Sequence, residues 1–377
     1  MVVQTKTDPA GPAEWLIQDP LIHLREWRTN NIHQLPAKDG EAIIGAADGC
    51  WIQVQDSITR VSRQHAKLTY DHASARWFIS DLHSKNGTFL EGARRMSFPI
   101  EPGTEIGIGG VTLVAESPLL CILRELLARL IGWAEERRAD VDLALRAVRK
   151  AATRRESLLI CGDGDLVSVA KLLHRHSLGH QRPFIVCDPR RKRRAPKAGR
   201  SVANYDEGMA ALAAATGGTL CIWRDRQPKD FPDVRAALKD PASRVQLVVC
   251  TRALPHEPDI TSQIVLPPLA HRTSELNRVI DAYAVDAVVA LDGAFSASDR
   301  DWVRQYASES LDKIETATRR LVAIRGADGS VSRAANQLRM AHSSLSTWLA
   351  RREQLPSDKD RVGDEGHEDD EDQEDEE

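Results

Sequence analysis

The fold of the N-terminal part is decided by two stretches, Arg60-Val61-Ser62-Arg63-Gln64-His65-Ala66 and Asp81-Leu82-His83-Ser84-Lys85-Asn86-Gly87-Thr88. Around these polar segments, short runs of alternating apolar and polar residues are separated by Gly, Asp, Asn and Pro. Alternation with a period of two is typical of strands that bury one face. The runs are EAIIG, CWIQV, HAKLTY, RWFISDL, GTFLEG, TEIGIG and VTLVAE. Their close spacing predicts a β-sandwich over residues 20–116.

Three spaced motifs in this block resemble those of the forkhead-associated (FHA) family. They are Ile44-Gly45, the Ser-Arg-x-His of residues 62–65, and the Ser-x-Asn-Gly-Thr of residues 84–88. The resemblance implies a β-sandwich whose loop tips bind phosphothreonine peptides. It also implies that Ser62 and Arg63 meet the phosphate, that Asn86 holds the peptide backbone, and that His65 has a packing role.

The residue types suit this chemistry without the family. A phosphothreonine is close to a dianion near pH 7 and needs clustered donors and cations on rigidly held loops. The candidate phosphopeptide-binding residues are Arg60, Ser62, Arg63, Ser84, Lys85 and Asn86.

One departure from the family pattern concerns a phosphate contact. The family has Gly-Arg where this chain has Gly45-Ala46. Two interpretations stay open: Arg60 compensates for the absent arginine, or the domain binds its partner without phosphate.

In the middle of the chain, the spacing of apolar residues changes twice. Residues 117–155 show apolar residues at helical spacing and are expected to form a helical connector. Residues 156–290 alternate helical stretches with apolar runs at 158–161, 184–187, 219–223, 246–250 and 263–266. Such alternation predicts an α/β domain with a mostly parallel sheet buried on both faces.

This region resembles the AAA+ domain of NtrC-like bacterial enhancer-binding activators, through LLIC-GDGD-LVSVAKLLH, ATGGTLCI, VQLVVCTRAL and IVLPPL. The parts that carry catalysis are missing. The segment Gly162–Asp165 lacks the Lys and Ser/Thr of a phosphate loop, and its carboxylates repel a triphosphate. Trp223-Arg224 stands where the family has Asp-Glu, and Arg252 where it has a sensor asparagine. We therefore expect no enzymatic activity, no catalytic residue and no cofactor; an active ATPase with a divergent loop is the remaining alternative.

The C-terminal part, residues 291–355, is predicted to be helical, with one long helix over 299–325. Residues 329–349 resemble a Fis-type helix-turn-helix, in which Ser332 would cap the first helix. The resemblance implies double-stranded DNA as a partner and a homodimer in which the long helix over 299–325 pairs with its twin, or a higher homo-oligomer. The candidate DNA-binding residues are His342, Ser343, Ser344, Ser346, Thr347, Arg351 and Arg352.

Net charge and composition narrow the classes of protein and of site that fit this sequence. The net charge is −4, but residues 364–377 hold 11 acidic residues, so the rest of the chain carries +7. We expect residues 1–19 to be flexible and residues 356–377 to be an acidic disordered tail. Six cysteines without a Cys-x-x-Cys pair argue against a metal site, and no apolar run is long enough for a membrane span.

The sequence thus predicts a multidomain protein: an FHA sandwich, an AAA+-like parallel sheet and an all-α helix-turn-helix. Its function is predicted as that of a cytoplasmic bacterial transcription regulator that senses a phosphothreonine protein partner. The alternative is a phosphopeptide-binding signalling scaffold with a vestigial DNA-binding end.

Overall fold

The computed structural model describes residues 19–55, 60–191, 203–240, 243–254, 260 and 262–353. The expectations of a flexible segment at 1–19 and a disordered tail at 356–377 therefore fall outside the described residues, apart from Asp19. Two units are distinguished: the first holds the residues up to 276 together with 309–312, and the second holds residues 277–308 and those from 313 onward, with most of the C-terminal helices.

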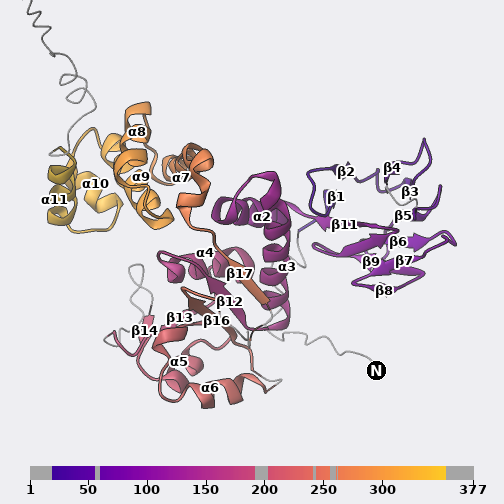
Figure 1. The fold of residues 1–377 in the computed structure, drawn as a ribbon, viewed down its shortest axis with the longest axis horizontal. Helices are drawn as coiled ribbons and strands as arrows, with labels where there is room; N and C mark the ends of the chain where they lie inside the picture. The colour runs from indigo at the N-terminus through magenta and orange to yellow at the C-terminus, as the bar shows by residue number, and fades with distance from the viewer. Residues whose placement is uncertain are drawn as a thin grey trace, which may run out of the picture. The chain divides into compact units, whose positions relative to one another are not determined.

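The N-terminal block is a sandwich of two sheets (Figure 1). The first sheet has the order β2 (Ile32–Gln34), β1 (His23–Glu26), β11 (Val111–Glu116), β10 (Glu105–Ile108), β7 (Thr88–Leu90) and β8 (Ala93–Arg94). The second has the order β4 (Ile52–Gln53), β3 (Glu41–Gly45), β5 (Ala66–Asp71), β6 (Arg76–Asp81) and β9 (Ser97–Ile100). All pairs are antiparallel except β3 with β4. Alternate residues such as Leu68, Ile79 and Ile106 fill the core between the sheets.

Two helices follow the sandwich as the sequence predicts. Helix α2 (Pro118–Ile131) begins at Ser117, whose side chain accepts the Leu120 N–H, and helix α3 (Arg138–Arg154) follows the short 3-10 turn Glu135–Arg137. A buried ion cluster connects α3 to the sandwich: the Arg25 guanidinium on β1 lies 2.8 Å from Glu116 on β11 and 2.6 Å from Asp142 on α3. The sandwich and α3 are therefore held together by charge pairing as well as by packing.

The middle of the chain forms a six-stranded sheet in which every pair is parallel. Its order is β14 (Ala203–Tyr205), β13 (Phe184–Cys187), β15 (Thr219–Trp223), β16 (Gln246–Thr251), β12 (Leu158–Cys161) and β17 (Ser262–Val265). Helices α2, α3 and α4 (Leu166–Leu178) cover one face, and α5 (Gly208–Ala214) and α6 (Phe231–Leu238) pack on the other (Figure 1). Short 3-10 turns lie at Arg224–Arg226 and Leu269–Glu275. The predicted doubly covered parallel sheet is confirmed.

The second unit is helical: α7 (Leu276–Leu291), α8 (Ala297–Tyr306), α9 (Leu311–Gly326), α10 (Val331–Gln337) and α11 (His342–Glu353). The prediction of one long helix over 299–325 is wrong, because the chain is not helical from Ala307 to Ser310. Helix α8 ends at the cap Ala307, and the Ser308 hydroxyl turns back to donate to the Arg304 carbonyl. Serines favour such local bonds over helix continuation.

Two smaller features complete the fold. The cap of α10 is Ser330, whose side chain accepts the Arg333 N–H, and not the expected Ser332. Across the residues that the structure describes, no helix combines the length and apolar character that crossing a bilayer requires.

Candidate functional site

The predicted N-terminal site residues lie on two loops that contact each other, β4–β5 and β6–β7. The Ser62 hydroxyl accepts the backbone N–H of Lys85 at 3.1 Å, and the Asn86 amide donates to the Arg60 carbonyl at 2.7 Å. Side chains of Arg60, Arg63 and Lys85 are exposed at this edge of the sandwich. The structure therefore brings together the hydroxyl, amide and cationic groups that the sequence singled out.

The buried His65 joins the two loops from below. Its Nδ1 accepts the Ser62 N–H at 3.1 Å, and its Nε2 lies 3.1 Å from the Gly87 carbonyl. Because Nδ1 accepts a hydrogen bond, the neutral ring carries its proton on Nε2 and donates to Gly87. His65 thus has the packing role that the resemblance implied.

A second anchor lies beneath the β6–β7 loop, centred on Asp81. Its carboxylate accepts from the hydroxyls of Ser84 at 2.6 Å and Thr88 at 2.7 Å, while the Ser84 hydroxyl accepts the Gly87 N–H. Burial alone would raise the pKa of Asp81, but these hydrogen bonds lower it below its ordinary value. Ser84 is only 5% exposed, so its side chain shapes the loop from inside.

The β3–β4 loop passes close to the same site at Gly45 and Ala46. A Cβ on Gly45 would overlap the Arg63 carbonyl, so only glycine fits there. Ala46 donates its N–H to the Ser62 carbonyl at 3.0 Å and is itself exposed. The position where the family has arginine therefore lies beside Ser62 and is occupied by an exposed alanine.

One cation near these loops escaped the sequence analysis. Arg94 on β8 lies against Gly87, so that a Cβ on this glycine would overlap the guanidinium. The sequence shows only the glycine of the Asn-Gly-Thr motif, whose φ is +84° in the structure, and the motif does not reveal which side chain covers it.

The comparison with family models matches residues 42–109 to the FHA domain. The N-terminal sandwich is an FHA domain. No curated protein sequence matches this chain.

Solved structures similar to the FHA domain come from several bacteria. They include Rv1747 FHA-1 of Mycobacterium tuberculosis (24% identity, 26% of this chain, 97% of that chain, TM-score 0.23). EmbR of Mycobacterium tuberculosis in complex with a low affinity phosphopeptide is 22% identical over 30% of this chain and 27% of that chain, with TM-score 0.23. The FHA domain of the CT664 protein from Chlamydia trachomatis is 22% identical over 26% of this chain and 97% of that chain, with TM-score 0.23.

In the central domain, the segment Gly162–Asp165 connects β12 to α4, as a phosphate loop would. The Asp165 carboxylate, however, caps α4 by accepting the Ser168 N–H at 3.2 Å and its hydroxyl at 2.6 Å. A helix N-terminus that attracts anions is here already paired with a carboxylate of the chain. Asp163 is exposed beside it and adds a second negative charge.

The C-terminal candidate residues lie on α11, which packs against α10 through Leu345, Ala334 and Ala335. Six of the seven candidates are exposed: His342, Ser343, Ser344, Ser346, Thr347 and Arg351. The Thr347 hydroxyl donates to the Ser343 carbonyl within the helix.

Arg352, the seventh candidate, is engaged inside the helical unit. Its guanidinium lies 3.1 Å from the buried Asp299 carboxylate and 5.3 Å from the Trp302 ring centroid. Asp299 also accepts from Arg325 and Ser296. Arg351, not Arg352, is therefore the arginine of this pair that faces outward.

Proposed function

We propose that this protein is a cytoplasmic bacterial transcription regulator that reads a threonine-phosphorylated protein partner through its FHA domain and binds double-stranded DNA through α10 and α11. The observation that carries the first half is the contact between the two loops at Ser62, Lys85 and Asn86. FHA signalling rests on phosphothreonine peptides, and the exposed Arg60 and Arg63 supply positive charge for a phosphate dianion.

The DNA-binding half is supported by the helix pair. Two short helices packed through small residues, with an exposed row of hydroxyl and basic side chains on the second, suit a major groove. Self-association is supported by two exposed valines four residues apart on α7, Val285 at 61% and Val289 at 81%, which lie outside the predicted dimerisation segment 291–355. A homodimer would present two such helices to a palindromic site.

The proposed regulator acts without ATP hydrolysis. The Asp165 carboxylate at the start of α4 and the neighbouring Asp163 disfavour a nucleotide triphosphate at that loop. Phosphoryl transfer depends on positioning and charge neutralisation, which these side chains oppose.

DNA selection from genomic fragments tests the regulatory half. We expect the selected DNA sequence to be palindromic. Its affinity for the protein should fall steeply with added salt, and it should bind less tightly to an Arg351→Ala variant. Arg304→Ala, at another exposed arginine of the helical unit, is the matched control. Absence of any selected sequence would contradict DNA binding.

A phosphopeptide-binding scaffold is the second candidate. It is favoured by the ion pair of Arg352 with Asp299, which uses one predicted DNA contact for packing. A protein that binds phosphothreonine peptides but selects no DNA would be this scaffold.

A further inference from the structure

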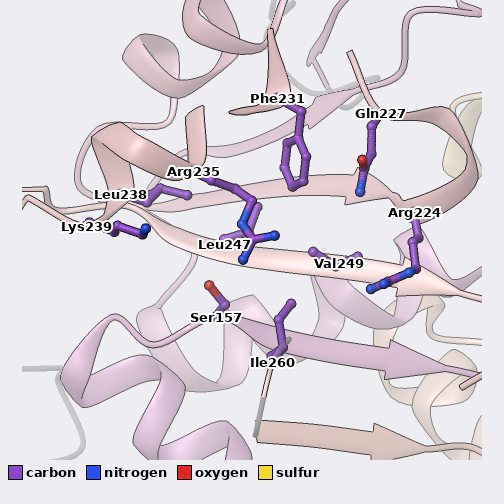
Figure 2. A pocket seen from close by; sticks show the side chains of 10 residues that line it. All are labelled: Ser157, Arg224, Gln227, Phe231, Arg235, Leu238, Lys239, Leu247, Val249 and Ile260. Carbon is purple, nitrogen blue, oxygen red and sulfur yellow. The ribbon is translucent and has the colours of Figure 1, made fainter. Parts of the chain in front are cut away.

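A basic pocket lies on the face of the parallel sheet that carries α6, away from the FHA loops β4–β5 and β6–β7. It encloses about 150 Å³ between α6, β16 and the residues that precede β12 and β17. Figure 2 shows Arg235 projecting from α6 toward the strand of Leu247 and Val249, with Ser157 opposite it and Arg224 at the other end. The arrangement gathers donors over an apolar floor.

The pocket continues into a wider hollow of about 730 Å³ that shares Arg224, Arg235 and Lys239 and adds Lys229. Among the described residues that line the two cavities, every charged side chain is basic. Clefts lined by one sign of charge concentrate ions of the opposite sign. This surface therefore favours an anion.

The spacing along α6 supports the same conclusion. Arg235 and Lys239 stand four residues apart, so their side chains are neighbours on one side of the helix and its cap. A single anion can therefore contact both side chains.

The floor of the pocket determines what else the ligand carries. Phe231, Leu247 and Val249 are buried at 7%, 4% and 2% exposure and still line the cavity. Ligand sites commonly combine such apolar walls with a few placed polar groups, here the Ser157 hydroxyl and the Gln227 amide. A bare inorganic anion would leave the apolar wall unused.

We propose that this pocket binds a nucleoside diphosphate, with the phosphates between Arg235, Lys239 and Arg224 and the ring system against Phe231. The site is separate from the loop Gly162–Asp165, because α4 packs on the opposite face of the sheet from α6. It requires neither the phosphopeptide nor the DNA activity. It would give the central domain a ligand without restoring an ATPase site.

Calorimetric titration of the full chain with adenosine and guanosine diphosphate tests the proposal, with adenosine and inorganic phosphate as separate probes. We expect at least one diphosphate to bind, with phosphate alone and adenosine each at least about tenfold weaker. Arg235→Gln and Lys239→Gln should each weaken binding about tenfold, the effect of one lost charge-assisted contact. Arg175→Gln, at an exposed arginine of α4 on the other face, should leave it unchanged.

Three results would overturn the proposal. One is no binding of either diphosphate at millimolar concentration. Another is undiminished binding by Arg235→Gln and Lys239→Gln, which would locate the ligand elsewhere. The third is inorganic phosphate binding as tightly as the diphosphates, which would leave no role for Phe231. Phosphothreonine-peptide binding by the same variants should stay normal, so failure here is separable from failure of the FHA function.

Discussion

The ion cluster at Arg25 offers the sharpest stability prediction. Arg25 is 2% exposed, and its guanidinium contacts the carboxylates of Glu116, 0% exposed, and Asp142, 3% exposed. Replacing Arg25→Met removes the positive charge while keeping an unbranched side chain. Of the contacts described for Asp142, the hydrogen bond from the Arg28 N–H would then remain. Glu116 would keep its contacts with His23 and Arg124.

Removing one partner of a buried pair costs about 3–5 kcal/mol, because the remaining charge is left uncompensated in a poorly solvated place. The matched control is Lys67→Met, whose ion pair with Glu41 has side-chain exposures of 31% and 63%. Such exposed pairs contribute about 0–1 kcal/mol. A combined Arg25→Met, Glu116→Gln, Asp142→Asn variant should recover part of the loss.

The same cluster predicts a pH dependence. Burial would raise the pKa of Glu116, but the His23 hydrogen bond and the charges of Arg25 and Arg124 lower it from 4.5 to about 2. A depressed pKa stabilises the fold above pH 4.5 by about 3 kcal/mol, and this is lost as pH falls toward 2.

Urea unfolding followed by circular dichroism and tryptophan fluorescence measures both effects. At pH 7 we expect the Arg25→Met variant to lose about 3–5 kcal/mol of unfolding free energy from the transition that includes the FHA domain. A loss no larger than that of Lys67→Met would refute the reasoning, as would stability unchanged between pH 5 and pH 2.5.

Three further predictions concern the sites. Ser84→Ala should lower the melting temperature of the FHA domain, with a cost of about 1–3 kcal/mol, because the Gly87 N–H loses its acceptor; an unchanged melting curve would contradict this. Arg63→Ala should weaken phosphothreonine-peptide binding about tenfold or more in calorimetry without changing the melting temperature; equal affinity would exclude Arg63 as a phosphate contact. Arg351→Ala should reduce the salt slope of DNA binding by about 1 in fluorescence anisotropy, and an unchanged slope would remove it from the phosphate contacts.

Sequence patterns were most informative where elements are periodic and apolar. The runs at 158–161 and 184–187 coincide with β12 and β13, because strands buried on both faces are continuous in apolar residues. Strand β14, with the sequence Ala-Asn-Tyr, lies at the sheet edge, is only three residues long and carries no such signal.

The alternation of apolar and polar residues did not predict the sandwich strands that depart from it. Strand β1 carries His23 and Arg25, whose burial depends on partners far along the chain at Glu116 and Asp142. Strand β9 contains Pro99, a residue that argues against a strand because it has no backbone N–H to donate. It is accommodated here because β9 is an edge strand.

The motif predicts the candidate phosphopeptide residues because it places them on adjoining loops. Only the structure shows which of them are buried and which lie at the surface. Ser84 is buried under the loop, whereas Ser62 is half-buried at the surface. Likewise, no local pattern distinguishes Arg351 from Arg352; only the approach of Asp299 does.

The most direct test of the central claim compares a phosphothreonine peptide library with its unphosphorylated counterpart on the full chain. The account predicts binding of phosphorylated peptides only, weakened by Ser62→Ala and strengthened by Ala46→Arg, which restores the family's cation beside Ser62. Equal binding of the unphosphorylated library, or no binding of either, would contradict it.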